Sequence, residues 1–399
     1  MAGMEQEFKT VLAQLTGPGA PWEVLRDEHD IAYYKLAPEN LVQAFEVARE
    51  HGDREFLVYE GERRSFARLM AEADAMAAAL QAQGIKPGDR VGLAMRNYPE
   101  WMTVFIAVVT IGAVIVPINS WGKPADIIHA LGDADVRLAV LDQARYSGVA
   151  DWLEANDVAA VIARPEDADD PLSLTTFVAR FQGASPPQVA IDGEDLALIM
   201  YTSGTSGAPK GAASTHRAMC QALYNFEFAA AAAAMCNMDR ISAMLERGFE
   251  STSLLAVPLF HVSGCHAQFL TNLRGGRRIV MMYKWDVDKA LEAIEQERIT
   301  AIAAAPSMVL DLLESPGFDR ADTSSLFSIG VGGAATPRRV SELIEAKLPT
   351  NFSGTGWGMT ETNAQGASLT GKAFGARPGS AGLPHPCLLY TSDAADDSR

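Results

Sequence analysis

Hydrophobic and polar positions alternate along the chain with two periods, one typical of a helix and one typical of an extended strand. Apolar residues recur with a helical period over 40–51 and 65–83, and short apolar runs lie at 90–95 and 136–141. Repeated alternation of this kind is typical of parallel sheets with helices on their faces. Ligands of such sheets bind beyond the carboxyl ends of the strands, so we expect the chemistry in the loops that follow strands.

The second half of the chain repeats the pattern after a stretch rich in proline and small residues at 183–188. We place a subdomain boundary there, between 1–186 and 187–386. A buried strand is predicted at 196–201. Four further units pair strands at 254–260, 277–282, 300–305 and 324–332 with helices at 264–273, 286–297, 306–314 and 337–347.

One uncharged segment, 101–122, is long enough to cross a bilayer. Gly112 and Pro117 interrupt it, and its β-branched residues cluster in the second half. We therefore favour a buried helix at 99–110 followed by a buried strand at 113–118, with no integral membrane span.

The formal net charge of −17 disfavours nucleic acid as a partner, because a phosphate backbone would be repelled. The four cysteines show no metal-binding or paired spacing, and the N-terminus has no secretory signal pattern, so we expect a cytoplasmic protein, either free or peripheral to a membrane. From Cys387 onward the composition changes abruptly. We interpret 387–399 as a non-native tail and expect the natural protein to continue differently.

The most informative stretch is YTSGTSGAPKG at 201–211, directly after an apolar strand. Its glycines let backbone N–H groups turn inward, its hydroxyls add donors, and its lysine adds a positive charge, which together suit a polyphosphate. The order Pro-Lys-Gly excludes a Walker A loop, and a flexible linker would not need it. The predicted phosphate-binding residues are Thr202, Ser203, Gly204, Thr205, Ser206, Gly207 and Lys210.

Three further segments follow strands: PLFHVSG at 258–264, VGGAAT at 331–336 and GWGMTET at 356–362. Taken alone, His261 would more often be a core residue and Glu361 a surface carboxylate. Together with the phosphate loop, however, the four segments resemble, in order, the core motifs of the adenylate-forming superfamily, which includes the acyl-CoA synthetases. The loop differs from the usual family string only by Ser206 in place of threonine.

The resemblance covers nearly all of 30–386. It implies an α/β fold, namely the large N-terminal domain of that superfamily, with two packed, mostly parallel sheets, flanking helices and no C-terminal lid domain. It also implies that Glu361 holds Mg²⁺ and that His261 borders the acid. Trp357 replaces the usual tyrosine and can still stack on adenine. The implied catalytic residues are Thr202, Lys210, His261, Thr360 and Glu361, and the remaining implied nucleotide-binding residues are Gly332, Gly333, Ala334, Gly356, Trp357, Gly358 and Thr360.

The function so implied is ATP-dependent activation of a carboxylic acid to an acyl-adenylate, followed by transfer to coenzyme A. Residues 256–273 contain no Asp or Glu to pair a substrate ammonium, which favours an uncharged acyl chain such as that of a fatty acid. An adenylate-former that loads a carrier protein and a non-catalytic ATP- or acyl-binding module stay open as alternatives. The family's later motifs do not occur in this chain, so we expect it to be inactive alone; its oligomeric state stays open.

Overall fold

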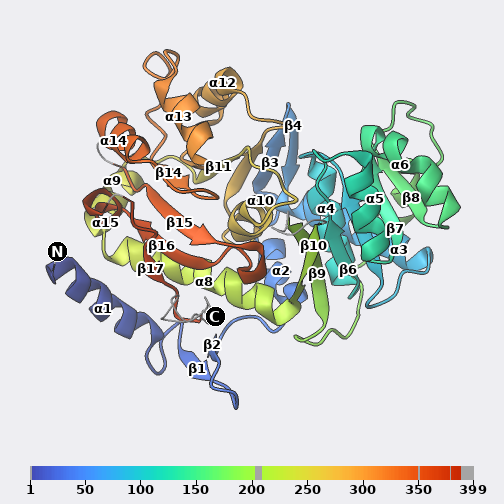
Figure 1. The fold of residues 1–399 in the computed structure, drawn as a ribbon, viewed down its shortest axis with the longest axis horizontal. Coiled ribbons are helices and arrows are strands. Elements are labelled where there is room, and N and C mark those ends of the chain that lie inside the picture. Colours follow the sequence, from blue (N-terminus) through green and yellow to red (C-terminus); the bar gives the residue numbers. More distant parts are fainter. Residues whose placement is uncertain (1, 203–208, 349–350, 378, 388–399) are drawn as a thin grey trace, which may run out of the picture.

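The computed structural model describes residues 2–202, 209–348, 351–377 and 379–387, with side chains from residue 7 onward. Two sheets lie side by side in these residues, and helices cover them (Figure 1). A short hairpin of β1 (Val24–Arg26) and β2 (Ala32–Tyr34) stands apart from both sheets. The predicted α/β class with two mostly parallel sheets is confirmed.

The first sheet has six strands within the described residues, and all but β10 run parallel. β10 pairs antiparallel with β9 and forms one edge. In spatial order the strands are β10 (Lys210–Thr215), β9 (Leu196–Thr202), β6 (Val114–Pro117), β5 (Arg90–Ala94), β7 (Val136–Asp142) and β8 (Ala159–Ala163).

The second sheet has nine strands in the described part of the chain, and its central six are parallel. Antiparallel strands close both ends. In spatial order the strands are β17 (Leu383–Pro384), β16 (Gly366–Thr370), β15 (Gly354–Gly358), β14 (Ser328–Val331), β13 (Ala301–Ala304), β11 (Thr252–Leu255), β12 (Arg278–Met281), β3 (Glu55–Tyr59) and β4 (Glu62–Ser65).

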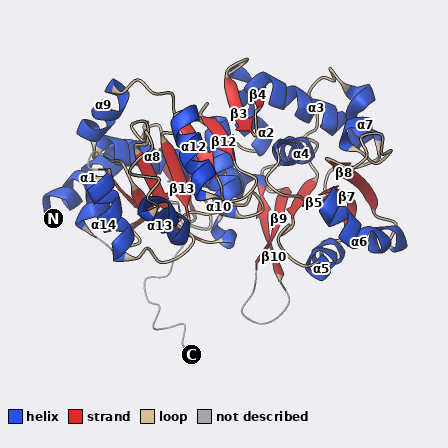
Figure 2. Ribbon diagram, turned by 90° about the horizontal axis from the view of Figure 1, so that it is seen from above, coloured by secondary structure: helices blue, strands red, loops and turns tan. Residues whose placement is uncertain are grey.

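Helices connect the strands and cover their faces (Figure 2). They are α1 (Ala2–Thr16), α2 (Leu41–Glu50), α3 (Phe66–Ala82), α4 (Pro99–Thr110), α5 (Pro124–Asp133), α6 (Gln143–Ala155), α7 (Leu174–Val178), α8 (His216–Met235), α9 (Met238–Glu246), α10 (Val262–Gly264), α11 (Thr271–Arg274), α12 (Val287–Glu297), α13 (Pro306–Glu314), α14 (Arg338–Lys347) and α15 (Lys372–Ala376). The 3₁₀ helices are η1 (Ala179–Phe181) and η3 (Thr360–Thr362), and η2 (Cys265–Leu270) is a π-helix.

The uncharged segment at 101–122 folds as the sequence predicts. All of β6 and every residue of α4 except Glu100 are buried. The rings of Trp101 and Phe105 stack at 5.4 Å, and Phe269 of η2 meets both edge-on. The described residues contain no helix with the length and apolarity needed to cross a membrane. A segment that is apolar on every side is thus buried in the core, with β6 inside the first sheet and α4 packed against α2, α3 and β5.

Two local expectations differ from the structure. The strand predicted at 254–260 ends at Leu255, because Pro258 has no N–H for a sheet and the backbone of Val257 and Leu259 bonds to the side chain of Asn97. The helix predicted at 264–273 is divided into α10, η2 and α11, with a π-helical turn in the middle.

The two sheets do not separate at the predicted boundary. β3 and β4 come from the first half of the chain but join the second sheet, whereas β9 and β10 come from the second half but join the first. The subdomains 1–186 and 187–386 stay a prediction, and most of the tail at 387–399 lies outside the described residues.

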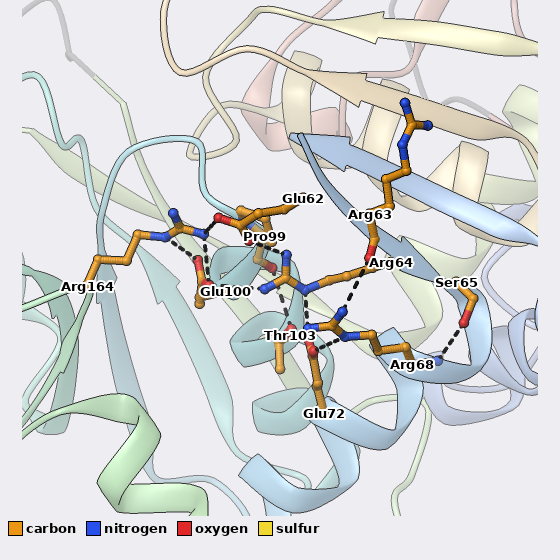
Figure 3. Close-up of polar contacts among 10 residues, drawn as sticks. All are labelled: Glu62, Arg63, Arg64, Ser65, Arg68, Glu72, Pro99, Glu100, Thr103 and Arg164. Atoms are coloured by element: carbon orange, nitrogen blue, oxygen red, sulfur yellow. Dashed lines mark hydrogen bonds and ion pairs between the residues drawn. The ribbon is translucent and has the colours of Figure 1, made fainter. Parts of the chain in front are cut away.

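A cluster of charged side chains, which we call the charge junction, joins elements of the two sheets (Figure 3). Its members are Glu62, Arg64, Glu72, Glu100 and Arg164. The side chain of Arg64 is only 8% exposed, and it pairs with all three glutamates at 2.9–3.2 Å. Arg164, just after β8, pairs with Glu62 and Glu100. The junction therefore ties β4 of the second sheet to α4 and β8 of the first.

Candidate nucleotide and acid site

The predicted phosphate loop connects the two strands of a hairpin at the edge of the first sheet. Thr202 is the last residue of β9, Lys210 is the first of β10, and the two are directly paired. The Thr202 hydroxyl donates to the Lys210 carbonyl at 3.4 Å, and the Lys210 side chain is exposed. Five predicted phosphate-binding residues, Ser203, Gly204, Thr205, Ser206 and Gly207, lie outside the described residues.

Helix α5 anchors this hairpin from one side. The Tyr201 hydroxyl donates to the Asp133 carboxylate at 2.6 Å, and His129 contacts the Pro209 carbonyl through Nε2 at 3.0 Å. Burial, and then the bond to Asp133, raise the pKa of Tyr201. His129 and Asp133 are one helical turn apart, so they lie on the same face of α5. Both flanks of the loop are thus held against one rigid element.

The hairpin packs tightly enough to require a glycine at its start. A Cβ on Gly211 would lie 2.8 Å from Cγ2 of Ile199. That distance is shorter than an ordinary van der Waals contact, so a larger residue would push β10 away from β9. The glycine of the Pro-Lys-Gly string therefore has a packing role in addition to any contact with phosphate.

Thr360 and Glu361 lie in η3, which packs against β10. The decisive contact is a buried hydrogen bond at 2.9 Å from the Ser214 hydroxyl to the Asn363 side-chain oxygen. It joins the phosphate hairpin of the first sheet to the turn between β15 and β16 of the second, and Figure 2 shows the hairpin standing between the two halves. Lys210 lies four residues before Ser214, roughly 13 Å along an extended strand.

The other glycine motifs form the neighbouring strand ends. Gly332, Gly333 and Ala334 follow β14, and a Cβ on Gly332 would lie 3.4 Å from the Gly356 carbonyl of β15. Gly333 has a φ of +81°, which glycine adopts without strain. The hydroxyls of Thr336 and Thr355 meet at 3.0 Å and fasten the loop to the strand.

Trp357 has 52% of its surface exposed. Its indole lies against Gly366, where an added Cβ would be only 2.3 Å from ring atom Cε3. Gly358 is equally constrained, since a Cβ there would lie 2.2 Å from the Ala364 carbonyl. The glycines of this hairpin thus leave room beside the strands for an exposed aromatic ring, which offers a face on which a base can stack.

His261 follows β11 and is the residue before α10. Its side chain is exposed, its ring lies 4.5 Å from that of Phe260, and desolvation by the surrounding residues lowers its pKa. None of the contacts described for His261 reaches Thr360 or Glu361. Its role beside the acid stays a prediction.

Asn97 is a positioning residue that the sequence analysis missed. Its buried amide donates to the carbonyls of Val257 and Met282 and accepts from the N–H of Leu259. It therefore ties the loop after β5 of the first sheet to the segment that leads to His261. Its place just beyond the carboxyl end of a parallel strand was the signal available in the sequence.

The donor set fits a Mg²⁺ ion bound mainly by a nucleotide. The Glu361 carboxylate is exposed and forms no ion pair with any described residue. The described residues contain no cluster of three or more acidic, histidine or cysteine side chains that could hold a metal. A single carboxylate is nevertheless sufficient for Mg²⁺, which keeps several waters and takes its other ligands from phosphates.

Comparison with known proteins shows the family of this chain. Residues 44–391 match the family described as AMP-binding enzyme. The chain belongs to this family. It is 30% identical over 322 residues to a feruloyl-CoA synthase of Amycolatopsis sp, covering 80% of this chain and 59% of that protein.

Two further similar proteins support this family assignment. The 4-coumarate–CoA ligase 2 of Nicotiana tabacum is 27% identical over 319 residues, which cover 79% of this chain and 56% of the relative. The crystal structure of the N-terminal domain of FACL13 from Mycobacterium tuberculosis superposes with a TM-score of 0.73 at 25% identity, over 88% of this chain and 83% of that one. This member of the AMP-binding family thus spans a little over half the length of the curated relatives it matches.

Proposed function

We propose that this chain carries the nucleotide and acid site of an AMP-forming acid–thiol ligase. The acid would first react with ATP to give an acyl-adenylate and pyrophosphate, and coenzyme A would then take the acyl group and release AMP. The observation that carries the proposal is the packing of η3, with Thr360 and Glu361, against β10 of the phosphate hairpin through Ser214 and Asn363. The names of the similar ligases support it.

In the proposed reaction an oxygen of the substrate carboxylate attacks the α-phosphorus in line, and pyrophosphate leaves. The task of the protein is to position the reactants and to stabilise developing charge. Lys210 and the hydroxyls of Thr202 and Thr360 would face the phosphates, and Trp357 would stack on adenine. A Mg²⁺ ion held by Glu361 would neutralise part of the phosphate charge.

The sequence and the similar proteins favour different acids as the substrate. The sequence favours an uncharged acyl chain, and a fatty acid stays our first proposal. The similar proteins named for 4-coumarate and ferulate favour an aryl acid instead. Transfer to a carrier protein in place of coenzyme A is the second candidate, supported only by the shared first half-reaction.

Calorimetric titration of this chain with ATP and with acyl-sulfamoyl adenosine, a stable mimic of the adenylate, tests the proposal. We expect both ligands to bind, and ATP to bind more weakly when Mg²⁺ is withheld. Glu361→Gln should remove that Mg²⁺ dependence, whereas Glu342→Gln, on the exposed face of α14, should keep it. Absence of binding by both ligands would refute the proposal. The expected lack of turnover by the chain alone is tested separately by pyrophosphate exchange.

A further inference from the structure

The Tyr201 side chain lies across the phosphate hairpin, from β9 to β10. Tyr201 and Gly211 are paired residues of the two strands, and a Cβ on Gly211 would lie 3.5 Å from Cζ of Tyr201 and 3.7 Å from its hydroxyl oxygen. These are ordinary van der Waals distances, so the ring covers the backbone of β10 where Gly211 has no side chain. One residue of β9 thus contacts both strands of the hairpin.

Helix α5 holds this ring and the opposite strand at the same level. The Tyr201 hydroxyl donates to Asp133 at 2.6 Å, and Nε2 of His129 lies 3.0 Å from the Pro209 carbonyl oxygen. The His129 ring also meets the Tyr201 ring edge-on, with 6.1 Å between the centroids. We call Tyr201, His129 and Asp133 the α5 brace. Its contacts reach both strands from a single turn of helix.

The brace is adjacent to two residues that the proposed function assigns to the phosphates. Thr202 follows Tyr201, Lys210 follows Pro209, and Thr202 and Lys210 are paired across the hairpin. β10 is an edge strand of the described sheet, so one of its sides has no strand partner. The far end of β10 packs against η3, whereas the end at Lys210 is held by the brace.

The contacts of the brace contribute more to orientation than to stability. Asp133 is exposed and the side chains of Tyr201 and His129 are half-buried, so water competes for the same polar groups. Burial and the bond to Asp133 raise the pKa of Tyr201, so the phenol keeps its proton and stays a donor. Nε2 of His129 must likewise carry a proton to bond a carbonyl oxygen. Each contact therefore has a fixed donor and acceptor, which restricts the angle between the hairpin and the helix.

We propose that the α5 brace positions the phosphate site by fixing the direction in which Thr202 and Lys210 face the nucleotide. Its members are positioning residues, and the inference rests on the proposed function. Positioning of this kind raises the affinity for the β- and γ-phosphates, because the donors need not be ordered when the ligand binds. The adenosine part would lie at Trp357, in β15 of the other sheet, where the brace has no effect.

The test is calorimetric titration of this chain with two ligands that share adenosine and differ in their phosphates. ATP with Mg²⁺ carries the β- and γ-phosphates, whereas octanoyl-sulfamoyl adenosine carries none. Tyr201→Phe should weaken the binding of ATP about tenfold and the binding of the mimic by less than about twofold. Equal weakening of both ligands would indicate a structural role, and unchanged binding of both would mean that the brace positions nothing. Either result overturns the inference.

Titration of the wild-type chain separates this inference from the proposed function. Failure of both ligands to bind would refute the proposed function. Binding of the mimic without any binding of ATP would overturn the inference alone, because no affinity for the phosphates would exist for the brace to set.

Variants of His129 test the contact with the other strand. His129→Leu should weaken the binding of ATP about fivefold and leave the mimic unaffected. His129→Gln should recover part of that loss, because its amide can donate to the Pro209 carbonyl. Recovery by glutamine is not expected from a role in packing alone. No recovery would overturn the role given to His129.

Two matched controls lie away from the brace. Tyr33→Phe, in the separate hairpin of β1 and β2, and His29→Leu, at an exposed position, should bind both ligands as the wild type does. If Tyr201→Phe does not fold, Asp133→Ala at the exposed end of α5 is measured against the same criteria.

Discussion

Two of the polar contacts between the sheets differ in charge. The charge junction gathers two arginines and three glutamates around the nearly buried Arg64 side chain. At the candidate site a neutral hydrogen bond from Ser214 to Asn363 links β10 of the first sheet to the turn after β15 of the second. The first contact is an ion-pair cluster whose central arginine is almost fully buried, whereas the second is a single buried hydrogen bond between neutral groups. We therefore expect the charge junction to contribute more to stability than the contact beside the candidate site.

The largest expected effect comes from breaking the charge junction. Arg64→Ala should lower the free energy of unfolding by about 3–5 kcal/mol, because it leaves glutamates partly buried without their main partner. Arg68→Ala removes a similar ion pair whose arginine is 58% exposed, and it should cost less than about 1 kcal/mol. Chemical denaturation measures both values. Equal losses for the two variants would show that the junction does not hold the sheets.

Acid should lower the free energy of unfolding through a buried histidine next to the phosphate hairpin. His216, directly after β10, is buried and accepts a hydrogen bond from the N–H of Leu41, and burial lowers its pKa to about 4 although Asp195 opposes the shift. The folded pKa lies below the unfolded value, so the unfolded state binds the proton more readily. This stability is fully present above about pH 6.5 and is lost as the pH falls toward the folded pKa, by about 1.4 kcal/mol per pH unit.

From pH 7 to pH 5 we therefore expect His216 to account for a loss of about 2 kcal/mol in the free energy of unfolding. Other buried histidines also contribute to the slope, so the comparison is with His216→Gln, which should flatten the dependence by that amount. Denaturant titrations at both pH values measure it. An unchanged slope in the variant would mean that His216 does not carry the effect.

Removing the neutral contact should have a smaller effect on stability. Ser214→Ala leaves the buried Asn363 oxygen without its donor and should cost about 1–2 kcal/mol. Binding of the adenylate mimic should weaken in parallel, because η3 loses its link to β10. Ser147→Ala, on the exposed side of α6, is the matched control. Unaltered ligand binding in Ser214→Ala would separate this contact from the site.

The smallest effect on folding is expected at Trp357, which is half exposed. Trp357→Ala should change the free energy of unfolding by less than about 1 kcal/mol. It should weaken binding of the adenylate mimic by about 1–3 kcal/mol, the usual value of an aromatic ring stacked on a base. Trp357→Tyr should retain most of the affinity. Equal binding by the alanine variant would place the adenine elsewhere.

Local pattern was sufficient to predict much of the fold. The helix predicted at 99–110 is α4, and the strand at 196–201 is β9 with one added residue, because long apolar runs and strong periods are decided by neighbouring residues. The helix at 264–273 was wrong in detail, since the π-helical turn of η2 depends on packing that no local period records.

The sequence predicted the separate motifs of the candidate site but not the contacts that join them. Residue type and spacing predicted phosphate binding for the string that contains Lys210, whereas metal binding by Glu361 was predicted only through the resemblance to the family. Ser214, Asn363 and Asn97 were missed, because each acts by contacting residues that are distant in the sequence. A single serine or asparagine in a sequence does not indicate which distant residue it will contact in the fold.

The order of residues is enough to predict that strands and helices alternate, that one loop suits a polyphosphate, and that the chain resembles its family. The three-dimensional fold shows in addition that β3 and β4 join the second sheet, that β9 and β10 join the first, and that the charge junction and the Ser214–Asn363 bond connect the two. This difference arises because local periods depend on neighbours within a few residues. Sheet order and polar contacts depend on groups brought together from far along the chain by burial of the shared core.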